Sequence, residues 1–359
     1  MLAHSISARF ELVTPGFASG ARPEDFAELR TEAMIGQLRR WWWAQAVLDE
    51  AFQGPKGFDV GKATTFADVL FGAAGSEDGA SDGTGQGAFL IMLRESTVAP
   101  MSKSTGLEDL FGPLWRRRSQ WLWTAPPNTR PSFTVAFMLR PSRIRTSKHN
   151  DASLTLGLRR ALALWGLLGG MGAGQRRGFG SVQLVEMTVA GGDEPSWMPP
   201  RTIAEYLARL AETLPGQLGS RGTPQEFGSF AAAGTPPASM WIAQLPNCGD
   251  GKAALDTIVL QLRNLKTDIV SNQPTLTINN IIDLFSNQGN PRQRKPSPFH
   301  LHVARIDSSI GLILSVLPRA DCYPPARAAW ITGEAQAVMS LAERLHMTQV
   351  APPPTMVGR

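Results

Sequence analysis

The order of hydrophobic patterns in the first half of the chain constrains the fold more than any other feature of the sequence. Alternating apolar and polar residues are typical of a half-buried strand, whereas apolar residues at a spacing of about 3.6 are typical of a helix. The patterns predict a strand at 6–12, a helix at 28–52, strands at 88–96 and 132–140, a helix capped by Asp151 or Ser153 that ends at 168, and a strand at 178–189. The order β-α-β-β-α-β is that of the split βαβ, ferredoxin-like arrangement, which RRM-type RNA-binding domains share.

The second half of the chain is predicted to repeat this fold in degenerate form. With 359 residues the chain exceeds one domain of typical size, so two packed units are expected, and a Pro-rich stretch at 195–200 is typical of a linker. Helical patterns follow at 202–214, 253–266 and 334–346, and strand-like runs at 239–245, 299–306 and 311–317. We therefore predict an α+β protein of tandem ferredoxin-like (RRM-like) domains, at 1–194 and 201–359, the second of them degenerate.

Positive charge is concentrated in one part of the chain. The net charge is only +5, from 35 Lys and Arg against 30 Asp and Glu. Between Leu110 and Val185, however, twelve Arg or Lys occur with a single acid, Asp151. Such a block repels itself unless a polyanion or an acidic partner faces it, and counterion release makes that binding depend on salt. Nucleic acid is the predicted ligand.

Composition argues against several other classes of protein. Cys248 and Cys322 are far apart and in no CxxC spacing, so neither a disulfide framework nor a zinc site is expected. A reduced, cytoplasmic location fits this cysteine usage. The sequence contains no stretch of about 20 apolar residues and begins without a signal-like segment, so no membrane contact is expected. No cofactor is predicted.

The most informative motif is GGMGAGQRRGFGSV, at residues 169–182, between a predicted helix and a predicted strand. Glycines permit positive φ and close approach of the backbone to a ligand, and exposed amides form an anion nest. The planar guanidinium groups of Arg176 and Arg177 suit phosphate, so the backbone of RNA is the predicted ligand. Alternatively, the glycines only shape a tight turn and the arginines are solvated. A dinucleotide fingerprint is rejected, because that pattern runs from strand to helix and position 177 is Arg.

Tryptophan and arginine alternate in two further segments. Three tryptophans, Trp41 to Trp43, follow Arg39 and Arg40, and consecutive helical residues point about 100° apart, so at least one ring should face a partner or a base. Packing of these rings under the second domain is an equal alternative. The segment WRRRSQWLW, at 115–123, has the same composition, and there RNA contact is favoured.

Signals for catalysis are few. His300 and His302 lie on one face of a predicted strand, where a metal could bind, but a surface pair without a third ligand nearby is the favoured interpretation. His149, beside Lys148 in a basic loop, has the chemistry of a general base for RNA cleavage, but no partner acid or nucleophile accompanies it. Acids are sparse near the basic block, so a two-metal nuclease is not supported. No metal site is predicted.

The chain resembles the RAMP superfamily of CRISPR proteins and, within it, the first subunit of the Cmr (type III-B) effector complex. The resemblance rests on ELVTPGFASGA, IGQLRRWWW, FADVLFGAAG, GGMGAGQRRGFGSV and KPSPFHLHV, which occur in family order over nearly the whole sequence. It implies tandem ferredoxin-like folds and a place in antiviral defence at the end of the complex that holds the 3′ part of the guide RNA. CRISPR guide RNA, target RNA and neighbouring RAMP or Cmr subunits are the implied partners, and no nuclease activity is implied. The loop at 72–87 does not align.

The resemblance ranks the candidate RNA-binding residues. Those that match the superfamily loop come first, those that match the helix motif second, and a patch before the late Ser-Pro, which includes Arg292, third. The basic block supplies the remaining candidates. In that order they are Gly172, Gly174, Arg176 and Arg177; Arg39, Arg40 and Trp42; Arg294 and Lys295; and Arg143, Arg145 and Lys148. The alternative function is a metal-independent RAMP endoribonuclease that processes CRISPR transcripts and depends on His149 or His4, although 152–200 contain no histidine.

Overall fold

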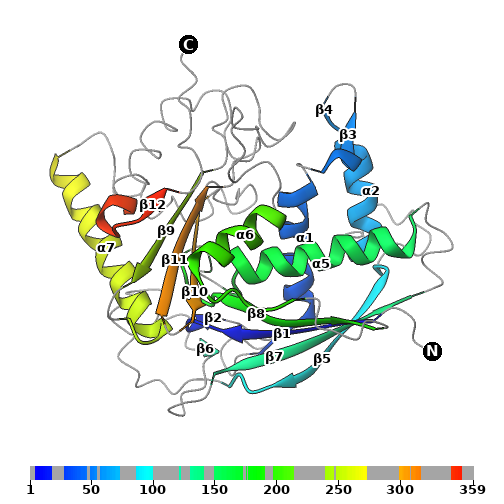
Figure 1. Cartoon of the computed structure of the whole chain (residues 1–359), viewed down its shortest axis with the longest axis horizontal. Helices are drawn as coiled ribbons and strands as arrows, with labels where there is room; N and C mark the ends of the chain where they lie inside the picture. Colours follow the sequence, from blue (N-terminus) through cyan, green and yellow to red (C-terminus); the bar gives the residue numbers. More distant parts are fainter. Residues whose placement is uncertain are drawn as a thin grey trace.

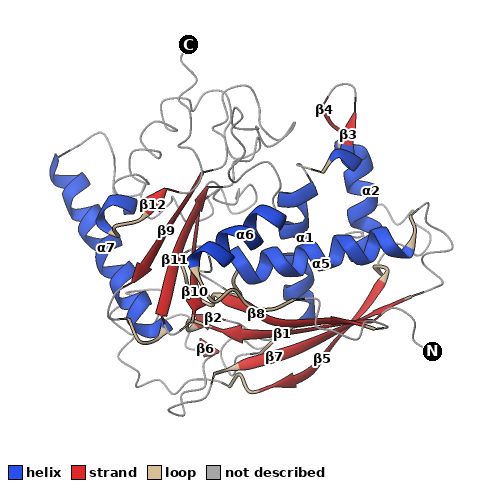
Figure 2. Ribbon diagram, in the orientation of Figure 1, coloured by secondary structure: helices blue, strands red, loops and turns tan. Residues whose placement is uncertain are grey.

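The computed structural model of the chain describes residues 5–17, 28–46, 49–54, 57–72, 86–99, 121–122, 130–140, 149–172, 175, 177–190, 197–213, 239–245, 248–272, 299–307, 309–316 and 341–349. These residues form two four-stranded antiparallel sheets and two small two-stranded ones (Figures 1 and 2). The small sheets pair β2 (Gly16–Phe17) with β6 (Trp121–Leu122) and β3 (Gln53–Gly54) with β4 (Gly57–Phe58).

The first large sheet has the predicted topology. Its strands are β1 (Ser5–Leu12), β5 (Phe89–Ser96), β7 (Ser132–Leu139) and β8 (Val182–Val189), in the spatial order β5-β7-β1-β8. The helices α1 (Thr31–Ala46) and α5 (Asp151–Leu168) follow the first and third of these strands. This is the ferredoxin-like order, so the predicted α+β class is confirmed. An additional helix, α2 (Val60–Phe71), follows the 3₁₀ turn η1 (Glu50–Phe52) and was not predicted.

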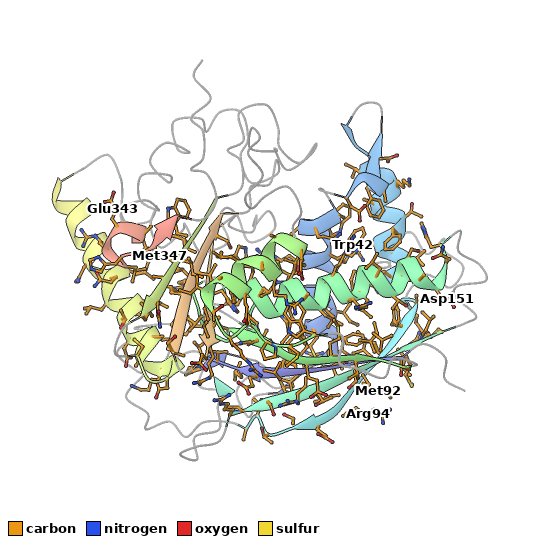
Figure 3. All side chains as sticks on the ribbon, viewed as in Figure 1. Trp42, Met92, Arg94, Asp151, Glu343 and Met347 are labelled. Atoms are coloured by element: carbon orange, nitrogen blue, oxygen red, sulfur yellow. The ribbon has the colours of Figure 1, made fainter. Side chains whose placement is uncertain are left out.

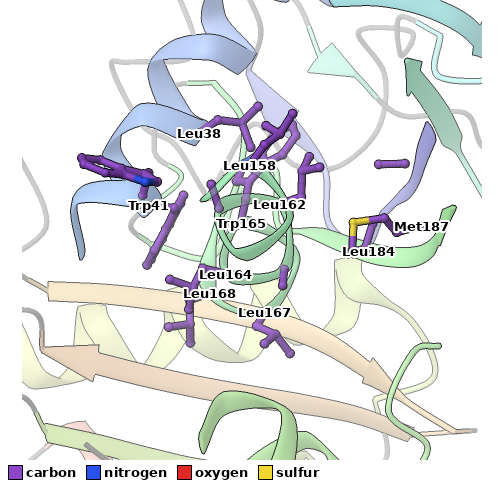
Figure 4. Close-up of a cluster of buried hydrophobic side chains, with 14 of the residues drawn as sticks. Leu38, Trp41, Leu158, Leu162, Leu164, Trp165, Leu167, Leu168, Leu184 and Met187 are labelled. Atoms are coloured by element: carbon purple, nitrogen blue, oxygen red, sulfur yellow. The ribbon is translucent and has the colours of Figure 1, made fainter. Parts of the chain in front are cut away.

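The second half of helix α5, residues 161–168, is buried on all of its sides. Its cap is Asn150, whose Oδ1 accepts the N–H of Ser153 at 2.8 Å, one residue earlier than the sequence predicted. From Leu154 onwards it packs against the first sheet and α1, while Leu164, Leu167 and Leu168 point toward the second sheet (Figure 4). An all-round apolar surface is typical of a helix enclosed by other elements.

The second large sheet repeats the strand order of the first. It contains β9 (Ser239–Leu245), β10 (Phe299–Ile306), β11 (Ser309–Val316) and β12 (Thr348–Gln349), in the order β10-β11-β9-β12. The helix α7 (Gly251–Asn272) follows β9, and a short helical turn at 341–344 precedes β12. The last strand has only two residues, as a degenerate copy of the fold would have.

The two sheets differ in what covers their faces. One face of the second sheet packs on α7 through residues such as Leu312, and the opposite face, which includes Ile242 and Ile313, joins the hydrophobic cluster of the first unit. The second sheet therefore lies between α7 and the helices of the first unit (Figure 1). By contrast, the first sheet turns one face away from its helices, where Met92 and Arg94 are drawn (Figure 3).

Of the stretch 195–200 that was predicted as a linker, residues 197–200 are described, and Trp197 lies beside the edge strand β8. Trp197 is buried, forms an isolated bridge with Met187 and donates its Nε1–H to the carbonyl of Leu184 at 2.9 Å. The following helix, α6 (Ile203–Thr213), packs on α5, and its Tyr206 hydroxyl donates to the carbonyl of Leu167. Among the described helices, none is long and apolar enough to cross a membrane.

Candidate nucleic-acid interface

The glycine-rich loop connects α5 to β8 and lies against the second sheet. A bridge between Gly170 and Ser181 closes its base, and the N–H of Met171 donates to the carbonyl of Gly180 at 2.7 Å. Gly172 is exposed and has a φ of 78°. On the other side of the loop, Arg177 forms a parallel backbone bridge with Leu301 of β10. The loop therefore sits at the seam between the two ferredoxin-like units.

Two buried hydroxyl groups fix the conformation of the loop. The Thr14 hydroxyl donates to the carbonyl of Gly178 at 2.6 Å and accepts the N–H of Ser181 at 2.9 Å. The Ser181 hydroxyl donates to the same carbonyl at 2.9 Å and accepts the N–H of Val303 at 3.1 Å. A carbonyl oxygen has two lone pairs, so both donors are accommodated. Thr14 and Ser181, with Gly178 between them, form what we call the hydroxyl knot.

Glycine is required at two positions of the loop. Gly180 has a φ of 61°, and a Cβ there would lie 2.2 Å from the carbonyl oxygen of Met171. Gly178 has a φ of 84° and faces side chains of the second unit, with Ile258 at 3.3 Å from such a Cβ. Positive φ is costly for residues with a Cβ, so Gly180 serves the close approach of the two ends of the loop, and Gly178 the close approach of the two units.

Side-chain contacts between the two units continue along β8. The Gln183 amide accepts the N–H of Arg305 at 2.8 Å and donates to its carbonyl at 2.8 Å, as a neighbouring strand would. Phe179 is buried in the hydrophobic cluster of the second unit. The edge of β10 is thus satisfied partly by side chains of the first unit.

Arg177 is the loop cation whose surroundings point to a ligand. Its side chain is half-buried, and burial lowers the pKa of its guanidinium group. The Nε atom is buried and has no hydrogen-bond partner among the described residues. A desolvated cation is unfavourable, and because a guanidinium retains its proton, a phosphate at the exposed part of this side chain would compensate its charge. The predicted role of Arg177 is therefore chemically consistent with its position.

The candidates of α1 contact protein groups. The Arg39 guanidinium donates to the carbonyl of Gly72 at 2.6 Å and pairs with Asp68, which ties α1 to the end of α2. The Trp42 ring is buried and stacks on Phe66, with 5.3 Å between centroids. Arg40 donates to Nε2 of His300. Trp42 therefore presents no free face for a base, and Arg39 has a structural role.

The histidine pair of β10 is buried, so the predicted surface location is wrong. His300 lies edge-on to Trp41, with 5.4 Å between ring centroids. His302 donates from Nδ1 to the carbonyl of Gly169 at 2.8 Å, and desolvation by burial lowers its pKa to about 4. The cause of the error is that β10 turns this face toward the first unit. Among the described residues, no three metal-ligating side chains come together.

His149 lies far from the glycine-rich loop. It precedes α5, whose 18 residues span about 27 Å, whereas the loop follows the other end of this helix. Figure 3 shows Asp151 at the end of α5 that points away from the second sheet. The His149 ring packs edge-on to Phe66, with 4.8 Å between centroids. Burial, followed by the charge of Lys62, lowers the pKa of His149.

The remaining candidates lie outside the described residues, so their roles stay predictions. They are Gly174, Arg176, Arg143, Arg145, Lys148, Arg292, Arg294, Lys295 and His4. In the segment 115–123, only Trp121 and Leu122 are described, and they form β6.

Neither large sheet offers a base-stacking surface of the RRM type within the described residues. The open face of the first sheet carries aliphatic side chains such as Leu90, together with Ser7, Thr134 and the pair of Arg9 with Glu186, whose N···O distance is 3.3 Å. The equivalent face of the second sheet is covered by the first unit. Stacking on exposed aromatic rings is how RRM sheets bind RNA, so the glycine-rich loop is the better candidate surface.

Thr14, Ser181 and Gln183 are the residues of this site that sequence patterns did not identify. Gln183 lies between the apolar residues Val182 and Leu184, and Thr14 occurs in the Thr-Pro turn after β1. These patterns do not reveal the contacts, which join positions far apart in the chain: Thr14 and Gly178 are separated by 164 positions.

Comparison with known proteins supports the fold-level resemblance. No protein-family model matches the chain, and no relative is found among curated proteins. Among solved structures, Cmr1 from Pyrococcus furiosus is similar, with a TM-score of 0.58 and 17% identity over 97% of this chain and 99% of that one. A chain of the type III-B Cmr-beta complex bound to cognate target RNA has a TM-score of 0.52 and 10% identity, over 94% of this chain and 100% of that one. A chain of the same complex with target RNA and AMPPnP, in the presence of ssDNA, has a TM-score of 0.51 and 12% identity, over 96% and 98%.

Proposed function

We propose that the chain is an RNA-binding, non-catalytic subunit of a type III-B CRISPR (Cmr) effector complex. In this role it contacts guide and target RNA near the 3′ end of the guide and touches other Cmr subunits, in cytoplasmic antiviral defence. The likeness in fold to Cmr1, over nearly the full length of both chains, supports this assignment. So does the likeness to chains of Cmr complexes that hold target RNA.

The proposal that the chain binds RNA depends mainly on one observation, the burial and incomplete hydrogen bonding of the Arg177 side chain. Arg177 places its positively charged guanidinium group in the glycine-rich loop. Its Nε–H is buried, and none of the described residues accepts a hydrogen bond from it. The side chain as a whole is only half-buried, so a phosphate at its exposed part would pair with the guanidinium and offset the desolvation of the charge. Gly172, exposed nearby with positive φ, allows the backbone of RNA to approach.

This mode of contact predicts binding with little sequence preference. Contacts to phosphate position a protein on RNA without reading bases, and they make affinity depend on salt. The open face of the first sheet carries Arg9 and Glu186 in place of aromatic rings, which also favours backbone contact. Replacement of Arg177 by Ala should weaken binding across sequences and reduce the salt slope by about one.

The endoribonuclease alternative depends on a histidine near bound RNA. His149 is about 27 Å from the glycine-rich loop along α5, so RNA held at Arg177 would need a second contact region to reach it. A general base must lie within hydrogen-bond reach of the proton that it removes. The separation therefore favours the binding subunit.

The deciding experiment incubates the purified chain with labelled CRISPR repeat-spacer RNA in EDTA. The same samples are run on native and denaturing gels. A mobility shift with intact RNA, weakened in Arg177→Ala, is the expected result. Discrete fragments that disappear in a His149→Ala variant would instead identify a metal-independent endoribonuclease.

A further inference from the structure

We infer that the hydroxyl groups of Thr14 and Ser181 are positioning residues, which act on RNA only by holding Arg177. The inference deepens the proposed function and rests on it. Neither hydroxyl is a candidate RNA contact, because both residues are fully buried in the hydroxyl knot. Their effect on a ligand must therefore pass through the loop.

The geometry places Arg177 between two fixed points. On one side its backbone forms the bridge with Leu301 of β10. On the other side the next residue, Gly178, has its carbonyl oxygen held by the Thr14 hydroxyl at 2.6 Å and by the Ser181 hydroxyl at 2.9 Å. Because Gly178 has positive φ and no Cβ, its own conformational preference is weak, so these two bonds select the conformation. The direction of the Arg177 side chain follows from it.

The two hydroxyl groups do not hold the same structures together. Thr14 belongs to the turn after β1, so its hydroxyl joins the loop to the first unit alone. Ser181 also accepts the N–H of Val303, so its hydroxyl joins the loop to the second unit as well. Both hydroxyl groups donate to the carbonyl of Gly178, so loss of either hydrogen bond should make the Arg177 side chain more mobile.

The hydroxyl knot favours RNA binding because it preorganises the Arg177 side chain. An arginine held in its binding orientation does not lose side-chain freedom when phosphate arrives, whereas a released one does. Thr14→Val retains the branched shape but removes a donor from Gly178 and leaves the N–H of Ser181 without its acceptor. For Thr14→Val we expect a roughly tenfold loss of affinity for RNA. This is about the loss expected when one hydrogen bond to a charged group, here the phosphate, is weakened. Thr14→Ser, which retains the hydroxyl, should restore most of it.

The test measures the affinity of the full chain for fluorescein-labelled CRISPR repeat RNA by fluorescence anisotropy. The variants are Thr14→Val, Thr14→Ser, Arg177→Ala and the double Thr14→Val with Arg177→Ala. Thr213→Val is the matched control, because Thr213 is also buried and donates to a backbone carbonyl at 2.6 Å, in α6. If Thr14→Val does not fold, Ser181→Ala, alone and with Arg177→Ala, takes its place.

The expected result is weaker binding for Thr14→Val and Arg177→Ala, near-normal binding for Thr14→Ser and Thr213→Val, and no further loss in the double variant. If Arg177→Ala weakens binding while Thr14→Val behaves like the control, the positioning role is wrong and the proposed function stands. An additional loss in the double variant would also overturn it, because Thr14 would then act by another route. Unchanged affinity in Arg177→Ala would overturn the proposed function itself.

Discussion

The two four-stranded sheets have the same strand order but opposite surroundings. The first sheet covers one face with α1 and α5 and leaves the other open, whereas the second is covered on both faces, by α7 and by the first unit. Equivalent residues in the two sheets therefore face water in one and protein in the other. The comparison teaches that topology alone does not decide which surface of a ferredoxin-like unit is available to RNA. Among the described residues, Arg177 of the glycine-rich loop and Arg305 of β10 each have a buried Nε without a hydrogen-bond partner.

The largest expected effect tests whether the glycine-rich loop depends on the close approach of its own backbone segments. Gly180→Ala adds a Cβ at 2.2 Å from the Met171 carbonyl in a residue with a φ of 61°, so strain and overpacking together should cost about 4 kcal/mol. Unfolding in urea measures the loss. Gly36→Ala, in α1 with no atom within 4 Å of the added Cβ, is the control and should stabilise the protein by about 0.5 kcal/mol. Equal effects would show that the loop tolerates a side chain.

A pair of truncations compares the two sheets directly. Ile313→Ala, in β11 on the face toward the first unit, should cost about 3 kcal/mol because the side chain is 1% exposed and leaves a cavity. Met138→Ala, in β7 next to the exposed Leu90 on the open face of the first sheet, should cost less than about 1 kcal/mol. Chemical denaturation of both variants measures the difference. Similar losses would contradict the contrast between a covered and an open face.

The buried His302 of β10 should make the free energy of unfolding depend on pH. The pKa of His302 is about 4 in the folded chain and 6.5 when exposed, so the unfolded state binds the proton first as pH falls. The stability is therefore complete above pH 6.5 and is lost as pH decreases toward 4, by about 3 kcal/mol. The check compares urea unfolding at pH 7.5 and pH 4 for the native chain and His302→Asn. A variant with the same pH dependence as the native chain would exclude His302 as its source.

The smallest effect belongs to the open face of the first sheet. Arg9 and Glu186 form an ion pair across β1 and β8, with N···O 3.3 Å and side chains 44% and 46% exposed. Exposed pairs contribute little, so Arg9→Ala should change stability by less than about 0.5 kcal/mol, and salt should abolish the difference. Thermal unfolding at low and high salt measures it. A larger loss would mean that a partner element covers this face.

Sequence patterns predicted the secondary-structure elements better than they predicted the contacts between residues far apart in the chain. Hydrophobic periodicity is local, so the order of the six elements of the first ferredoxin-like unit, β1, α1, β5, β7, α5 and β8, was predicted correctly, as was the place of the glycine-rich loop. The helix at 28–52 was predicted too long, because the η1 turn continues the apolar run after Ala46. The apolar positions of α2 fit a helical face, but of these only Phe66, Ala67 and Leu70 were noted, as part of the motif FADVLFGAAG.

Contacts between distant segments were beyond local patterns. The alternation of β10 placed His300 and His302 on one face but did not reveal that the first unit covers it. Likewise, the Arg39 side chain pairs with Asp68, and the basic character of α1 carries no information about that partner. Arg177 was identified because glycines and arginines in one loop have a local signature, whereas Thr14 became part of the site only through folding.

The side-chain pairing of β10 has a consequence for the chain during synthesis. Ser181 and Gln183 occupy the edge of this strand, and Ile242 and Ile313 lie beneath the first unit. A fragment that begins at residue 239 would expose an eight-residue strand edge beside an apolar surface, which is a template for aggregation. In the full chain the first unit covers this edge and this surface, so we expect such a fragment to be insoluble when it is expressed alone.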